Sequence, residues 1–177
     1  DVDPSTNSDI RAKLAFTDLS ALGGKYSGGL TAEATIKGPA EAREIALTAT
    51  GNGLGIGQAD VDRIIGGQSD LSLSLVQKGT VIELRDFALK NGQVTLDAQG
   101  AATDSGRIIT LSSRLRDMAL LAPGFPGPLT LDGQIAQTAS GYDLDLKASG
   151  PGNTKATIAG TAAADFSTAD LRIDGGA

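Results

Sequence analysis

The stretch FALKNGQVTLDAQG, residues 87–100, contains the pattern on which the fold of this chain depends. Asn91-Gly92 lies between two short apolar runs, and this dipeptide is the strongest short-range signal of a β-hairpin. After the turn, Val94 and Leu96 point to one side of the predicted strand, and the polar residues between them point to the other. The predicted strand therefore has one apolar and one polar face. What the apolar face touches is the central question for the whole chain.

The same alternation of apolar and polar residues recurs along the chain with period two, which is typical of half-buried β-strands. Gly, Asn, Asp and Pro stand between the runs, where turns require them. The pattern predicts about ten strands joined mostly by short turns, and short connections imply antiparallel pairing of neighbours. The predicted strands include the runs 30–36, 45–49, 71–75, 94–98, 109–115, 129–135, 142–148 and 171–173.

Helical signal is scarce in this sequence. The segments TDLSAL (17–22), ADVDRII (59–65) and RDMALL (116–121) each allow a turn or two of helix. Segments of this length are too short to be stable on their own, because helix nucleation is costly. The sequence therefore predicts an all-β fold with only short helical connections.

The composition argues against several classes of protein. The 177 residues contain no Cys and no His, so the chain has no disulfide framework, no thiolate metal site and no His to activate a serine. The net charge of −6 comes without a basic patch, which disfavours nucleic-acid binding because phosphate contacts dominate that affinity. No apolar run approaches the ~18 residues of a membrane span.

Two pairs of acidic residues resemble the paired carboxylates of acid–base catalysis: Asp143 with Asp145, and Glu83 with Asp86. The alternation of the predicted strands instead places such residues on a solvated strand face. We therefore expect no catalytic residue, no metal ligand and no cofactor. The sequence predicts that this protein is not an enzyme.

The chain also repeats itself. Residues 16–53 align with residues 115–152 without a gap at an offset of 99, and Asp18 meets Asp117 while Leu30 meets Leu129. Turns and apolar positions stay in phase throughout the alignment. Internal repetition indicates an architecture of stacked similar units. We predict one all-β fragment of a longer chain over 1–177, with repeat units of about 10–108 and 109–177, the second of them truncated.

Two architectures fit the two-faced strands. In a closed β-sandwich or barrel the apolar faces pack on one another, and most alternating strands belong to such closed cores. In an open, curved sheet the apolar face would form a trough larger than the apolar patches that soluble monomers expose. A lipid chain is a suitable guest for a trough, since each buried methylene contributes ~0.8 kcal/mol.

Several phrases resemble the TamB branch of the AsmA-like family of bacterial envelope proteins. They are FTDLSAL…GGLTAEATIKG (16–38), its copy LRDMALLAPGFPGPLTLDGQI (115–135), and LRDFALKNGQVTLDAQG (84–100). The amino-acid composition of the chain, poor in aromatic residues and rich in Leu, Ala, Gly and Asp, is similar as well. The resemblance covers nearly the whole chain and rests on diffuse patterns of strands and glycines.

The resemblance implies an elongated, curved, mainly antiparallel sheet folded into an open hydrophobic groove, a β-taco, in the periplasm. Proteins of this family are held in the inner membrane by an N-terminal helix, which this sequence does not include. They are implicated in moving phospholipid between the inner and outer membranes. With an Omp85-type outer-membrane barrel, a TamA-like subunit, they also support the assembly of autotransporters and nascent β-barrel proteins.

We therefore expect a non-enzymatic hydrophobic conduit whose apolar face contacts phospholipid acyl chains. One alternative is a chaperone-like scaffold whose sheet edge pairs with a client strand by β-augmentation. Another is a closed, adhesin-like β-sandwich. An isolated piece with a free sheet edge is also able to pair edge to edge with a second copy. The residues predicted to form the apolar face are Leu30, Ile36, Ile45, Leu47, Leu71, Leu73, Leu75, Val94, Leu96, Leu129, Leu131, Ile135, Leu144, Leu146 and Ile158.

Overall fold

The computed structural model is all-β, with eleven strands and one short α-helix, and the chain forms two compact units. Unit 1 ends at Gln93, and unit 2 begins at Val94. The model describes residues 7–39, 41–79, 81–103, 106–165 and 167–176.

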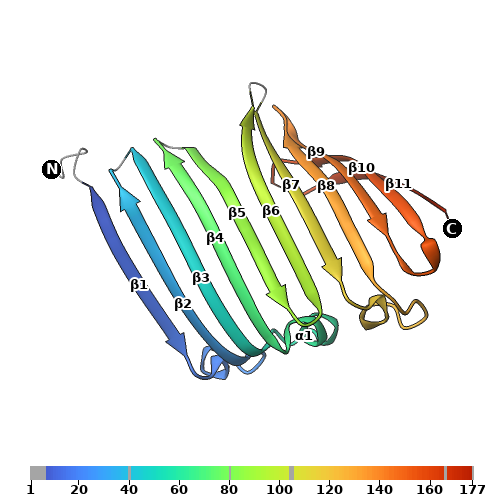
Figure 1. Ribbon diagram of the computed structural model, residues 1–177, viewed down its shortest axis with the longest axis horizontal. Coiled ribbons are helices and arrows are strands. Elements are labelled where there is room, and N and C mark those ends of the chain that lie inside the picture. The colour runs from blue at the N-terminus through green and yellow to red at the C-terminus, as the bar shows by residue number, and fades with distance from the viewer. Residues whose placement is uncertain (1–6, 40, 80, 104–105, 166, 177) are drawn as a thin grey trace. The chain divides into compact units, whose positions relative to one another are not determined.

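Unit 1 contains the strands β1 to β5, which follow one another in chain order across the sheet (Figure 1). The 3-10 turn η1 (Leu19–Leu22) connects β1 to β2, and helix α1 (Ala59–Ile65) connects β3 to β4. Figure 1 shows both at the same, lower end of these strands. The strand bounds are β1 Ser8–Phe16, β2 Ser27–Gly38, β3 Ala42–Gly55, β4 Gln68–Lys78 and β5 Val81–Asn91.

Unit 2 contains the strands β6 to β11, again in chain order. The 3-10 turn η2 (Met118–Leu120) lies between β7 and β8, and η3 (Pro151–Asn153) lies between β9 and β10. The strand bounds are β6 Val94–Thr103, β7 Gly106–Leu115, β8 Leu129–Gln137, β9 Gly141–Ser149, β10 Lys155–Ala163 and β11 Ala169–Gly176.

Within each unit, successive strands pair in antiparallel fashion. Short connections explain this order, because a chain that reverses in a few residues places the next strand beside the last. In the described part of the chain, neither unit closes into a barrel or stacks a second sheet on the first. The closed sandwich, which alternation alone favours, is therefore not the architecture of either unit.

The elements expected from the sequence are present. All the predicted strand runs lie within strands, and the three predicted helical segments contain η1, α1 and η2. Near the predicted Asn91-Gly92 turn, β5 ends at Asn91 and β6 begins at Val94, so a turn is present there but its connecting residues are Gly92 and Gln93. The finer prediction, that the sheet is curved and folded into a groove, stays a prediction.

The two aligned phrases also carry the same order of elements. Each has a strand, a 3-10 turn and two further strands, with Asp18 and Asp117 as the residues that begin the turns. The backbone angles of the two are nearly equal, with φ −147° and ψ 116° at Asp18, and φ −144° and ψ 115° at Asp117. After Gly51 and Gly150 the copies diverge, because α1 follows one and η3 with β10 follows the other. The repeat units 10–108 and 109–177 stay a prediction.

Neither unit has a conventional hydrophobic core. Among the described residues, the buried hydrophobic residues are Val76, Leu115 and Leu146, which are 8%, 7% and 8% exposed. No described side chain is exposed by less than 2%. A single-layered sheet has this property because no second layer of the same unit packs on it.

Candidate functional site

One face of the unit 1 sheet is apolar from β1 to β5. Residues directly opposite one another in an antiparallel pair share a face of the sheet. Ile36 of β2 lies opposite Ile10 and Ile45, and Ile45 lies opposite Leu75. The unit 1 apolar face consists of Ile10, Ala12, Leu14, Phe16, Leu30, Ala32, Ala34, Ile36, Ile45, Leu47, Ala49, Leu71, Leu73, Leu75, Leu84, Phe87 and Leu89.

Unit 2 also has one apolar face. Leu146 of β9 lies opposite Gly133 and Ile158, and Ile158 lies opposite Ile173. As in unit 1, most apolar residues of this face lie opposite apolar residues or glycine, and Ser113 lies opposite Leu96 and Leu131. The unit 2 apolar face consists of Val94, Leu96, Ala98, Ile109, Leu111, Leu115, Leu129, Leu131, Ile135, Leu144, Leu146, Ala148, Ala156, Ile158, Leu171 and Ile173.

All the residues predicted to line a groove lie on these two faces. Unit 1 brings together those from Leu30 to Leu75, and unit 2 brings together those from Val94 to Ile158. Their contact with acyl chains or with a client protein stays a prediction.

Sequence reasoning missed the contributions of β1 and β5. In β5 the alternation is broken by the consecutive polar residues Arg85 and Asp86, and a register irregularity opposite Ser74 and Leu75 accommodates them. A β-bulge inserts one extra residue and so returns Phe87 to the face of Leu84. A doublet of polar residues between two apolar runs is the signal that could have revealed it.

Both apolar faces are open to solvent in part. The predicted residues are half-buried, apart from the buried Leu146. Towards β1 the exposure rises to 54% at Ile10 and 49% at Leu14, and on β11 it reaches 66% at Ile173. Neighbouring side chains of the same face supply the partial burial, since each sheet is a single layer.

The opposite face of unit 1 is polar and carries paired side chains. Lys13 Nζ lies 3.3 Å from Glu33 Oε2 on the neighbouring strand, and Thr50 Oγ1 donates to Asp70 Oδ1 at 2.8 Å. Glu83, one of the predicted solvated carboxylates, lies 3.4 Å from Lys78 Nζ.

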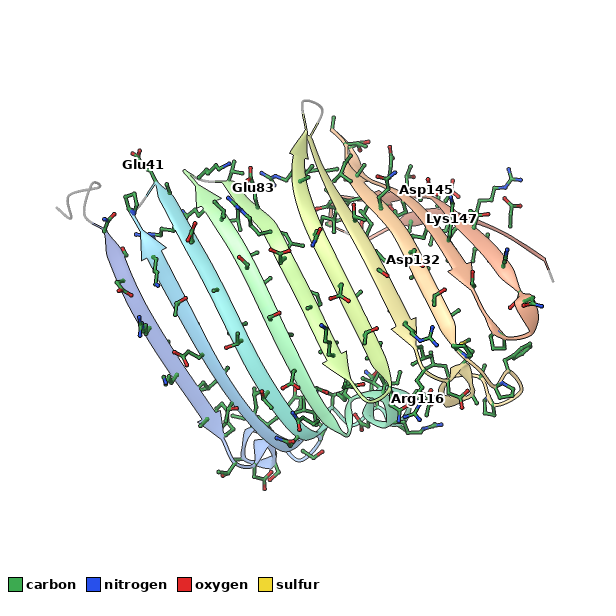
Figure 2. The ribbon with its side chains drawn as sticks, viewed as in Figure 1. Glu41, Glu83, Arg116, Asp132, Asp145 and Lys147 are labelled. Atoms are coloured by element: carbon green, nitrogen blue, oxygen red, sulfur yellow. The ribbon has the colours of Figure 1, made fainter. Side chains whose placement is uncertain are left out.

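The polar face of unit 2 has the same character. Ser112 Oγ donates to Asp132 Oδ1 at 2.6 Å, and the register places Lys147 opposite Asp132. Figure 2 shows Asp132, Asp145 and Lys147 on the neighbouring strands β8 and β9. Asp143 and Asp145 are both exposed, so they occupy the solvated strand face that the alternation predicted.

A cavity of about 520 Å³ lies at one end of the unit 2 apolar face. Met118 and Phe125, from the segment between β7 and β8, line it together with Leu129 and Ala156 of the sheet. Lys155 is the one charged residue among its lining residues. The volume lies in the range of small-molecule sites, roughly 300–1,000 Å³.

Asp117 holds the segment that borders this cavity. Its Oδ1 accepts hydrogen bonds from the backbone N–H of Gly127 at 2.9 Å and of Ala119 at 3.0 Å. The hydrogen bond from Gly127, followed by that from Ala119, holds the pKa of Asp117 below its usual value. Met118 N in turn donates to Gly127 O at 2.7 Å, so the loop closes on itself.

The described residues contain no group of three or more His, Cys, Asp or Glu side chains placed to hold a metal ion. Nor does that part of the chain contain a helix of the length and apolarity that spans a membrane. Compared with models of protein families, with curated proteins and with solved structures, the chain gives no match.

Proposed function

We propose that this chain is a segment of a periplasmic, non-enzymatic envelope-biogenesis protein whose apolar sheet faces hold phospholipid acyl chains. In this proposal the sheets fold into an open hydrophobic groove, and the full-length protein is anchored in the inner membrane. The groove conducts phospholipid towards the outer membrane. An Omp85-type barrel and nascent outer-membrane proteins are the partners that the resemblance to the TamB branch implies.

The observation that carries the proposal is the openness of the two apolar faces. Each extends across the strands of its unit, and no second sheet of that unit lies over it. In the described residues, α1 contacts one end of the unit 1 face, and the segment between β7 and β8 borders one end of the unit 2 face. Soluble monomers rarely expose a contiguous apolar patch of more than a few hundred Å². Such a face gains stability from any apolar guest, because burial of apolar area is favourable and non-directional.

The residue types on the faces support an acyl chain as that guest. The side chains are mostly Leu, Ile, Val and Ala, and the whole chain is only 3% aromatic. An aliphatic surface offers dispersion contacts without fixed polar partners, so it does not select a particular fatty acid. About 14 buried methylenes would contribute ~11 kcal/mol before ordering costs.

Site-specific photocrosslinking in cells grown with radiolabelled phosphate tests the proposal. The crosslinking residue replaces Leu144 on the unit 2 apolar face, and its neighbour Asp145 on the polar face serves as the matched control. We expect labelled phospholipid to be captured at 144 and not at 145. Efficient crosslinking at 144 without label, in a folded protein, would contradict the proposal.

A second candidate function rests on the edges of the sheets. Among the described strands, β1 pairs only with β2 and β11 pairs only with β10. All eight residues of β11 are exposed, so its outer backbone groups are accessible to a client strand by β-augmentation. A crosslinker in place of Asp170 of β11 would then capture protein, while the Leu144 position would capture no lipid.

A further inference from the structure

Arg43 is the one charged side chain among the described residues on the apolar side of the unit 1 sheet. It lies in β3 two residues before Ile45, and its register partner in β4 is Gln77. Two residues apart in a strand means the same face, so Arg43 extends the row of Ile45, Leu47 and Ala49 at one end.

Among the described residues, the guanidinium of Arg43 has no hydrogen-bond or ion-pair partner. The side chain is half-buried, its Nε is buried without a hydrogen-bond partner, and it belongs to none of the ion pairs of the described residues. Gln77, its neighbour on the face, instead donates its amide to Gly79 O at 2.9 Å. A buried donor on a charged group is costly to leave unsatisfied.

The nearby carboxylates do not supply that partner. Glu44 follows Arg43 directly in β3 and so lies on the polar face, opposite Lys37. Glu83 is also on that face and pairs with Lys78. Figure 2 shows Glu41 at the upper end of unit 1, where β2 connects to β3, two residues before Arg43, but Glu41 forms none of the ion pairs of the described residues. The cation therefore stands at the end of an otherwise uncharged face.

We infer that Arg43 binds the phosphate of an anionic lipid whose acyl chain lies on the unit 1 apolar face. The inference rests on the proposed function and adds a headgroup site and a direction to it. A guanidinium suits this role because its planar fork donates two parallel hydrogen bonds to phosphate oxygens. The headgroup lies at the end where β2 meets β3, and the acyl chain points towards the end that carries α1.

The length of the apolar rows fits one acyl chain. From Ile45 to Ala49, strand β3 presents apolar residues on this face over ~14 Å, at ~3.4 Å per residue. One leaflet of a membrane contains ~15 Å of hydrocarbon, half of a ~30 Å core. Beyond Ala49 the next positions on β3, β4 and β5 are Gly51, Ser69 and Asn91, so the apolar row of these three strands ends there, while Leu30 and Phe16 continue it on β2 and β1.

The test compares two probes that differ only in charge, dodecyl phosphate and its uncharged dimethyl ester, below their micelle concentrations. Their Kd values are measured by displacement of a dansyl fatty acid from the full chain, which has no Trp to interfere with the fluorescence. We expect the wild type to bind dodecyl phosphate about tenfold to a hundredfold more tightly than the ester. In Arg43→Gln, we expect the two Kd values to become equal.

Two further variants serve as controls. Lys37→Gln removes a cation from the polar face one strand away, and we expect it to keep the wild-type ratio. Arg43→Lys keeps the charge but loses the planar fork, so we expect it to retain part of the ratio. If Arg43→Gln does not fold, the wild type and Arg43→Lys decide the question, because equal Kd values in the wild type overturn the inference.

The outcomes separate this inference from the proposed function. Equal, measurable binding of both probes by the wild type overturns the headgroup site and leaves acyl binding intact. The same holds if Lys37→Gln lowers the ratio as much as Arg43→Gln, because the attraction would then be non-specific. Failure of the wild type to bind either probe contradicts the proposed function itself.

Discussion

Asp117 shows how one side chain sets the conformation of a loop that borders an apolar face. Asp18, its counterpart in the other copy of the aligned phrase, has nearly the same backbone angles. Asp18 bonds only to Ser20, two residues away, at 2.8 Å. Asp117 instead reaches Gly127 across ten residues. Both aspartates cap the 3-10 turn that follows them, but Asp117 also fixes the backbone ten residues further along the chain.

We predict that Asp117→Ala loosens the segment between β7 and β8, while Asp18→Ala leaves the segment between β1 and β2 closed. The physical reason is that only Asp117 satisfies a backbone N–H distant in sequence. Amide hydrogen exchange of Gly127 measures the effect, and we expect faster exchange in Asp117→Ala alone. Unchanged Gly127 exchange in that variant would contradict the prediction.

The same carboxylate gives the loop a dependence on pH. Because the folded pKa of Asp117 is depressed, the carboxylate stabilises the loop at pH above its ordinary pKa near 4. That contribution is lost as the pH falls through the folded pKa. Exchange of Gly127 is therefore expected to accelerate at acidic pH in the wild type, relative to the intrinsic rate, and not in Asp117→Ala.

At the scale of the element, glycines set how closely the strands of unit 2 approach. A Cβ atom built on Gly133 of β8 would collide with the carbonyl oxygen of Asp145 in β9. One built on Gly160 of β10 would collide with the carbonyl oxygen of Asp170 in β11. Both glycines lie on the apolar side of the sheet.

We predict that Gly160→Ala lowers the free energy of unfolding of unit 2 by about 1–3 kcal/mol, the usual cost of overpacking. The added methyl group would push β11 away from β10, so the amides of β11 should also lose protection. Gly124→Ala is the matched control, because no atom lies within 4 Å of its added Cβ. Urea unfolding and hydrogen exchange measure both variants, and equal effects would count against the prediction.

At the scale of the whole molecule, the scarcity of buried apolar side chains has a thermodynamic consequence. The heat capacity change of unfolding reports the apolar surface that unfolding newly exposes, and a compact protein of this length shows about 2 kcal/mol/K or more. In this chain much of that surface is exposed already in the folded state.

We therefore predict a heat capacity change of unfolding clearly below that value, summed over all transitions of the chain. Differential scanning calorimetry at several pH values measures it from the dependence of the unfolding enthalpy on temperature. A value equal to that of a compact protein of the same length would show that the apolar faces are covered in solution.

The sequence by itself determined the local features of this protein. Period-two alternation identifies the strands and divides residues such as Leu144 and Asp145 between two faces, because neighbouring side chains of a strand point to opposite sides. The three short segments that the sequence allowed as helical turns contain η1, α1 and η2. The predicted face residues share the two apolar faces for the same reason.

Only the tertiary structure decided that no second sheet of the same unit packs on those faces. The alternation of apolar and polar residues is the same in a closed sandwich and in an open sheet. It therefore does not show whether a second layer packs on the apolar face. The bulge that returns Phe87 to the apolar face depends on the register with β4, and the isolation of Arg43 depends on which carboxylates lie across the sheet. These are long-range relations, and no spacing along the chain encodes them directly.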